Sequence, residues 1–178
     1  MLWLLIIIPA AAGGLSFAVP WNPARRALLI AAAASHAGLV AAAYPKPGFP
    51  APVLSGWIGL DAASYLFLAI TTVIFLAAAA YAVGYLAREG HRATPDADAD
   101  LAEEVPFANF PEAIFTGCLL FFLAAMSLVV LSRHWGLLWV AVEATTLASA
   151  PLIYYHRYAR SLEATWKYLV ICSVGIAL

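Results

Sequence analysis

The chain has 178 residues and a formal net charge of −1; 65% of its residues are hydrophobic and only 11% are charged. Soluble globular domains contain about 45–50% apolar and about 25% charged residues, so this composition excludes an ordinary soluble domain and indicates a membrane protein with several spans. The near-neutral charge gives no argument for a nucleic-acid partner. Cys118 and Cys172 lie in apolar runs without a CxxC pairing, which favours small core residues over a metal site or a disulfide.

The fold is predicted from the apolar segments, because about 20 mostly apolar residues in a helix cross a hydrocarbon core. Five segments meet that length, and a sixth begins near residue 165 and is too short to span, so we expect a last helix that is truncated. The first segment has no positive residues before it, which favours a span over a cleaved signal peptide. The sequence therefore predicts an all-α, polytopic membrane helical bundle of about six transmembrane helices, at about 2–20, 25–44, 62–86, 112–131, 136–155 and 165–178.

The orientation is predicted from Lys and Arg in the short loops, which favour the cytoplasmic side. Three alternate loops hold two arginines each, whereas the opposite loops hold only Lys46 and Arg133; the six arginines are Arg25, Arg26, Arg88, Arg92, Arg157 and Arg160. The N-terminus is therefore expected outside and the loop 87–111 in the cytoplasm. Five tryptophans fall near the predicted span ends, where an amphipathic ring prefers to lie, namely Trp3, Trp21, Trp57, Trp135 and Trp166.

Two longer loops differ in composition. The outer loop around "PKPGFPAPVLSGWIGLD" is rich in Pro and Gly, which predicts an irregular or extended segment. The acidic inner loop "REGHRATPDADADLAEEVPFANFP" lacks apolar periodicity and is typical of a flexible linker, with a docking surface for a soluble partner as the alternative. Phosphate-loop, nucleophile and metal-ligand motifs do not occur in the sequence.

Glu143 lies well inside the apolar run "GLLWVAVEATTLASAPLIYY". A carboxylate at the centre of a span costs about 2.5–3.5 kcal/mol on insertion scales. Ionisable residues inside spans are therefore rare, and they tend to mark ion or proton pathways. Thr146, one turn further on, gives that helix face a small and polar character, so the face is expected to point into protein. The residue pattern favours a protonatable group on a proton route; the alternative is a structural acid held by a neighbouring donor.

Other ionisable residues in or near the spans leave alternatives open. Lys167 lies near the predicted cytoplasmic start of the sixth span, either as a partner for Glu143 on the next, antiparallel helix or as a lysine that reaches the interface. His36, inside the second span, is a candidate relay residue together with Thr146, or else a packing residue. Asp61 is expected to cap the third helix, and three residues are read as solvated boundary residues: Arg133, His134 and His156.

The segments "GLLWVAVEATTLASAPLIYYHR" and "LEATWKYLVICSVGIAL" resemble the antiporter-like proton-translocating membrane subunits of complex I, Mrp-type antiporters and membrane-bound hydrogenases. The tokens "WVAVEATTL", "EATWKYL" and "CSVGIAL" are most similar to those of hydrogenase-4 component F and the formate hydrogenlyase membrane subunit. "LDAASYLFLAITTVIFLAAAAYAVGYL" and "LFFLAAMSLVVLS" are similar to the third and fourth spans of the family. The resemblance covers almost the whole chain but only the N-terminal part of such a subunit.

The resemblance implies roles that the residues alone do not give. It places the essential intramembrane glutamate at Glu143 and the lysine of the following helix at Lys167, as a proton-translocation pair in a non-redox subunit of a proton-pumping oxidoreductase. It implies no cofactor in this chain, a bacterial inner-membrane location, and other membrane subunits and a soluble hydrogenase or dehydrogenase arm as partners. An Mrp-type cation/proton antiporter and a non-pumping membrane anchor remain the alternatives.

Overall fold

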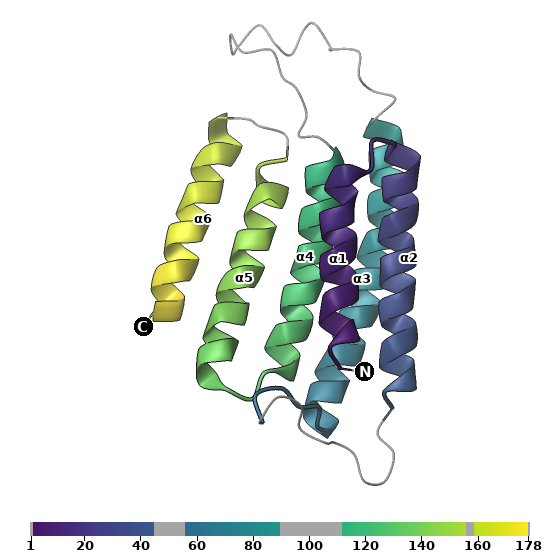
Figure 1. Ribbon diagram of the computed structural model, residues 1–178. Helices are drawn as coiled ribbons and strands as arrows, with labels where there is room; N and C mark the ends of the chain where they lie inside the picture. The colour runs from purple at the N-terminus through teal and green to yellow at the C-terminus, as the bar shows by residue number, and fades with distance from the viewer. Residues whose placement is uncertain (1, 45–55, 90–111, 156–158, 178) are drawn as a thin grey trace, which may run out of the picture.

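The computed structural model describes residues 2–44, 56–89, 112–155 and 159–177. These residues form six helices that run up and down side by side (Figure 1): α1 Leu4–Ala18, α2 Asn22–Ala42, α3 Ala62–Glu89, α4 Glu112–Leu131, α5 Trp135–Ile153 and α6 Ala159–Ala177. Within these ranges the only strand-like pairing is an antiparallel bridge between Ile58 and Ser132. The predicted all-α helical bundle is therefore confirmed. Most of the predicted linker 87–111 and His156 lie outside the described residues.

The sixth helix differs most from its prediction. It begins at Ala159, not near residue 165, and its 19 residues equal the length of α5. Its first turns are polar, and they are held by side chains along the helix: Lys167 pairs with Glu163, and the Thr165 hydroxyl donates to the Ser161 carbonyl (2.7 Å). Hydropathy detects only the apolar part of such a helix, so the prediction started too late. Trp166 consequently lies inside α6 and not at its start.

The structure supports a membrane protein by the length and apolar character of its helices. Three helices of the described part are long and apolar enough to cross a membrane: residues 62–88 of α3, all of α4 and all of α5. The α1 helix is also apolar but shorter, with 15 residues where the sequence predicted a span over 2–20. An exposed apolar side chain on these helices is therefore suited to contact with lipid or with another membrane helix.

Helices α1 to α4 share the buried apolar core. One cluster joins all four of them in the middle of the bundle, and its members are Ala12, Leu29, Ala32, Ala33, Phe75, Ala79, Ala82, Leu120 and Leu123. A second cluster closes the end at which α1 begins, and it includes Leu5, Val40, Leu68 and Leu131 together with Ile58 and Leu60 from the segment before α3. Alanines dominate the first cluster because small side chains let helices approach closely.

The closest approach between α1 and α4 runs through glycines. A Cβ atom added at Gly117 would lie 2.6 Å from the ring of Phe17 and 2.8 Å from the Ser16 Oγ, and one added at Gly13 would lie 3.2 Å from the Gly117 carbonyl. Ser16 links the two helices because its single hydroxyl hydrogen is shared between the Gly13 carbonyl of its own helix (2.7 Å) and the Ala113 carbonyl of α4 (3.2 Å). A Cβ atom at position 117 would therefore require the Phe17 ring and the Ser16 hydroxyl to shift.

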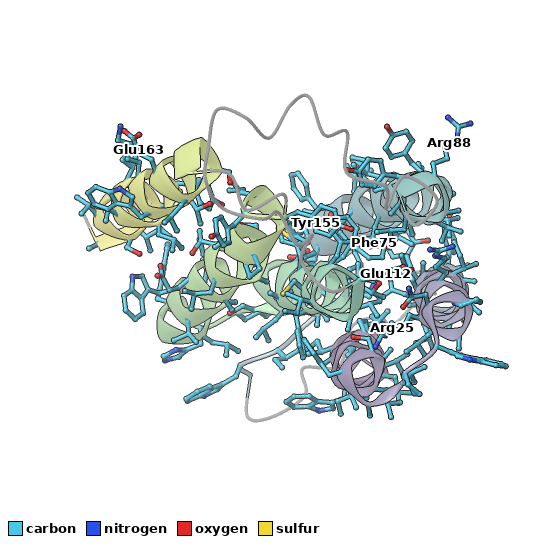
Figure 2. The ribbon with its side chains drawn as sticks, turned by 90° about the horizontal axis from the view of Figure 1, so that it is seen from above. Arg25, Phe75, Arg88, Glu112, Tyr155 and Glu163 are labelled. Carbon is cyan, nitrogen blue, oxygen red and sulfur yellow. The ribbon has the colours of Figure 1, made fainter. Side chains whose placement is uncertain are left out.

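The end of the bundle that carries Arg25, Arg26 and Arg88, here called the arginine end, is tied by an ion pair. Figure 2 looks onto this end, with Glu112 labelled at the start of α4. Arg26 of α2 donates to both carboxylate oxygens of Glu112 (2.6 and 3.0 Å) and to the Leu86 carbonyl of α3 (2.9 Å). The side chains are only 19% and 9% exposed, so one guanidinium joins three helices at a largely buried site.

Helix α6 lies at the edge of the bundle (Figures 1 and 2). Among the described elements it packs against α5 alone, and α5 in turn packs against α4. Neither helix contributes a residue to the two buried clusters, and large apolar side chains on α6 such as Trp166 and Ile171 are exposed. The α5–α6 pair is therefore attached to the α1–α4 bundle through one face of α5.

Candidate proton site at the interface of α5 and α6

Glu143 lies near the middle of α5, and its carboxylate faces α6. The Ser173 hydroxyl of α6 donates to the Glu143 Oε1 (2.8 Å), and both side chains are half-buried. An ionised carboxylate accepts such a bond more strongly than a neutral acid does, since charge-assisted hydrogen bonds are about twice as strong as neutral ones. The acid that the sequence predicts inside a span is therefore held by a hydroxyl of the next helix.

Thr146 does not touch the Glu143 carboxylate. Its hydroxyl donates to the Glu143 backbone carbonyl (2.7 Å), as Ser and Thr side chains in helices commonly do within one turn. Thr146 is buried, one of three buried residues that α5 presents, with Ala141 and Ala150 as the others. It lies one turn from the acid towards the arginine end, so it lines the same face without bonding the acid itself.

A second pair of hydroxyls joins α5 and α6 nearer the arginine end. Ser149 Oγ and Tyr168 OH lie 2.9 Å apart, and either oxygen can be the donor. The Ser149 hydroxyl also lies 2.9 Å from the Thr146 carbonyl, to which it can donate. Both side chains are half-buried. The two contacts, Glu143 with Ser173 and Ser149 with Tyr168, set α5 and α6 antiparallel and fix their register.

Lys167, the predicted partner of Glu143, is not in contact with it. Its ammonium group pairs with Glu163 one turn earlier on α6, and both side chains are more than half exposed. Lys167 is six residues from Ser173, which is about 9 Å along the helix and about 120° around it. The structure therefore places the lysine nearer the arginine end than the acid, as its position in the sequence led us to expect, and on a different face of α6 from Ser173.

His36 is fully buried and joins three helices. Its Nε2 lies 2.9 Å from the Ser127 Oγ of α4, and its Nδ1 lies 3.2 Å from the Thr72 Oγ1 of α3. Each hydroxyl is also within bonding distance of its own helix, at the Leu123 carbonyl (2.8 Å) and the Leu68 carbonyl (2.7 Å). The hydrogen bonds that start at the ring thus end on backbone carbonyls of α3 and α4.

A neutral imidazole has one N–H donor and one acceptor nitrogen. One hydroxyl can therefore accept from the ring and keep its backbone bond, whereas the other must share its single hydrogen between the ring and its own carbonyl. Both ring nitrogens of His36 therefore have hydrogen-bond partners inside the core, which favours the interpretation of His36 as a packing residue. The alternative assignment of His36 as a relay residue stays a prediction.

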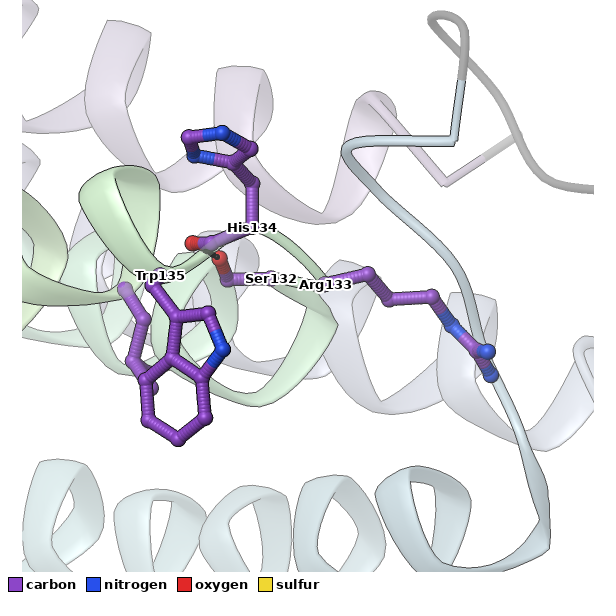
Figure 3. A pocket seen from close by; sticks show the side chains of 5 residues that line it. Ser132, Arg133, His134 and Trp135 are labelled. Atoms are coloured by element: carbon purple, nitrogen blue, oxygen red, sulfur yellow. Dashed lines mark hydrogen bonds between the residues drawn. The ribbon is translucent and has the colours of Figure 1, made fainter.

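Residues at the opposite end form a small surface pocket of about 220 Å³ at the turn from α4 to α5 (Figure 3). Arg133 points away from His134 there and pairs with Asp61 (3.2 Å), and the His134 ring stacks on Trp57 at 4.5 Å. Asp61 accepts from the backbone N–H of Ser64 (2.7 Å), so it caps α3 as expected. That bond, with a smaller effect of Arg133, lowers the pKa of Asp61.

The residues of the α5–α6 interface that sequence reasoning missed are Ser149, Tyr168 and Ser173. A usable signal was present, because Ser161, Thr165, Tyr168 and Cys172 recur at helical spacing on one face of α6. Only the register of two antiparallel helices shows which hydroxyl meets the acid. The described residues contain no group of three or more His, Cys, Asp or Glu arranged to hold a metal ion, and both cysteines are free thiols.

Comparisons with known proteins give partial sequence matches to subunits of two kinds. The chain is 31% identical over 122 residues to a hydrogenase-4 component F homolog of Methylacidiphilum infernorum, which is 67% of this chain. It is 41% identical over 51 residues to NADH-ubiquinone oxidoreductase chain 2 of Xenopus laevis, 29% of this chain, and 38% identical over 61 residues to that of Gallus gallus, 34% of this chain. No family model and no solved structure matches the chain.

The coverage of these relatives is short. The chain spans 22% of the length of the Methylacidiphilum infernorum protein and 15% and 18% of the two chain 2 proteins. Both kinds of relative are membrane subunits of the type that the sequence resemblance named, and the fold is the all-helical bundle that the resemblance implies. The chain therefore belongs to the antiporter-like membrane subunits of the complex I family.

Proposed function

We propose that this chain is part of a proton-translocating membrane subunit of a redox-driven respiratory complex of the hydrogenase-4 or formate hydrogenlyase type, with Glu143 as a proton-carrying group. The observation that carries the proposal is the Glu143 carboxylate, which lies inside a membrane-type helix and bonds to a hydroxyl of the neighbouring helix. The similarity to a hydrogenase-4 component F homolog supports the choice of complex.

The mechanism depends on the charge of Glu143. Removal from water disfavours the carboxylate, whereas hydrogen-bond donors and a nearby cation favour it. Ser173 supplies a hydrogen-bond donor. Lys167, about 9 Å from Ser173 along the axis of α6, is a cation that is paired with Glu163. If a rearrangement driven by redox chemistry elsewhere brings the ammonium group to Glu143, the acid releases its proton; when Lys167 returns to Glu163, the acid takes up another.

Proton uptake in inverted membrane vesicles tests the proposal. The complex that contains the chain is energised with its electron donor, and proton uptake and redox turnover are followed together for the wild type and for Glu143→Gln. Gln keeps the shape and the bond to Ser173 but carries no exchangeable charge, so we expect uptake to be lost. Asp61→Asn serves as the control because it makes the same acid-to-amide change at an exposed helix cap.

The outcomes separate the proposal from its alternatives. Normal proton uptake at normal turnover in Glu143→Gln would overturn the proposal and support a non-pumping membrane anchor. Sodium-dependent proton exchange in vesicles that receive no electron donor would support an Mrp-type antiporter instead. Loss of uptake in Glu143→Gln but not in Asp61→Asn supports Glu143 as a working group on the path.

A further inference from the structure

Glu143 is separated from the arginine end by about half of α5, and a proton that reaches it from that end must cross this distance. Ser149 lies six residues from Glu143 towards the arginine end, about 9 Å along α5. Ser161 lies seven residues from Tyr168 in the same direction, about 10 Å along α6. Within this interval, hydroxyl groups along α5 and α6 bond to one another and to the helix backbones.

The face of α6 that meets α5 carries polar side chains from one end to the acid. Thr165, which is buried, and Tyr168, which bonds to α5, show that this face is turned towards α5. Its members recur at positions i, i+4, i+7 and i+11 and are Ser161, Thr165, Tyr168 and Cys172. Ser173, which bonds to the acid, follows Cys172 and lies about 100° further around the helix. The opposite side of α6 is apolar and exposed, with Val170, Ile171 and Val174 among its residues.

The Ser149–Tyr168 pair can hold its hydrogens in two arrangements without movement of the heavy atoms. In one, Tyr168 donates to Ser149 and Ser149 donates to the Thr146 carbonyl (2.9 Å). In the other, Ser149 donates to Tyr168, whose own hydrogen then points elsewhere. A group that passes protons along needs this ability, since it must receive on one side, release on the other and then reset.

We propose that the α5–α6 interface is the path by which protons reach Glu143 from the arginine end, with the Ser149–Tyr168 hydroxyl pair as its intermediate step. The inference rests on the proposed function of Glu143 and adds the route. Ser149 and Glu143 are about 9 Å apart along α5 and about 120° apart around it. The axial distance corresponds to about two water molecules at ordinary hydrogen-bond spacing. Only O–H bonds change: one proton enters from water at the arginine end, and one arrives on the Glu143 carboxylate.

The buried hydroxyls that contact His36 provide a comparison within the same chain. Thr72 and Ser127 each contact the His36 ring of another helix, but they lie inside the α1–α4 core and their hydroxyls are also bonded to their own backbones. Ser149, Tyr168 and Ser173 are half-buried instead, at an interface that only two helices form. Water can therefore reach the α5–α6 hydroxyls more readily than those of the core.

The test measures the initial rate of donor-driven proton uptake in the native complex for Tyr168→Phe and Ser149→Ala. Each variant removes one hydroxyl of the pair, and we expect uptake to slow by about a hundredfold, the lower end of the range for groups that transfer protons. Ser149→Thr keeps a hydroxyl and is expected to retain the rate. Tyr81→Phe is the matched control, because it removes a phenol hydroxyl from an exposed position on α3.

Redox turnover with an uncoupler and the amount of assembled complex are measured beside the uptake rate, so that a folding defect is recognised. If Tyr168→Phe does not assemble, Ser149→Ala against Ser149→Thr decides the question. Wild-type uptake in both hydroxyl-deleting variants while Glu143→Gln is inactive would overturn this path and leave the function of Glu143 standing. Normal uptake in Glu143→Gln would overturn the proposed function itself, and equal slowing in Tyr81→Phe would remove the specificity on which the path depends.

Discussion

The polar side chains of the α1–α4 bundle and those of the α5–α6 pair differ in burial and in how their hydrogen bonds are arranged. In the α1–α4 bundle, His36 and the Arg26–Glu112 pair each join three helices through closed sets of bonds. Along α5 and α6, Glu143, Ser149 and Tyr168 bond in pairs across one half-buried interface. Half of the most apolar stretch of α4 is buried, but only 17% of that of α5.

This difference indicates that a buried polar group can either stabilise the fold or exchange its hydrogen-bond partners, depending on what surrounds it. Hydrogen bonds enclosed by a core are costly to break, because each buried polar group left without a partner destabilises the fold by about 1–3 kcal/mol or more. A pair at a thinly covered interface can exchange its partners for water at little cost. Substitutions in the two regions should therefore have different readouts, with stability lost in the α1–α4 bundle and proton movement lost between α5 and α6.

The largest effect on stability is expected at the arginine end. Arg26→Met would leave the Glu112 carboxylate largely buried without its cation and should lower the free energy of unfolding by about 3 kcal/mol. Equilibrium unfolding in mixed detergent measures this loss. Arg25→Met is the matched control, because the exposed bond of Arg25 to Asn22 and its bond to the Ser16 carbonyl are worth about 1 kcal/mol.

The double variant Arg26→Met/Glu112→Met sharpens that prediction. It removes both charges together, so it should lose less stability than Arg26→Met alone, since no unpaired buried charge remains. Equal losses in the Arg25 and Arg26 variants would show that the ion pair does not join the three helices in the membrane.

A smaller effect is expected at the contact of α1 with α4. Gly117→Ala would place a methyl group within 2.6 Å of the Phe17 ring and should cost about 2 kcal/mol, in the range found for overpacked cores. Gly84→Ala, on α3, is the control: a Cβ there meets no heavy atom within 4 Å, so stability should rise by about 0.5 kcal/mol through the unfolded chain. Thermal unfolding of the two variants should shift in opposite directions.

The smallest stability effect of the three is expected at His36, where it also decides between the two interpretations of that residue. His36→Leu removes two bonds between helices, but Thr72 and Ser127 keep their own backbone carbonyls as acceptors. The loss should be about 1–2 kcal/mol, with the proton-uptake rate unchanged. A lost uptake rate with normal stability would instead support His36 as a relay residue and would remove the contrast between the two regions.

Much of the molecule could be predicted from the sequence, because apolar length and charge act locally. The presence and order of the six helices, the cap at Asp61 and the acid inside α5 follow from residues near one another in the chain. The start of α6 was predicted too late for a related reason: hydropathy measures the apolar part of a helix, whereas side-chain bonds such as Glu163 with Lys167 extend the helix backwards.

The tertiary structure alone decided which side chains meet. Spacing shows that α6 has a polar face, but the partner of Glu143 depends on the register of two antiparallel helices. Fewer than two turns of α6 separate Ser173, which bonds to the acid, from Lys167, which does not. The same holds for His36, whose neighbours on α3 and α4 are 36 and 91 residues away in the chain. Periodicity along one helix determines its faces, whereas contacts between helices depend on packing that no single segment encodes.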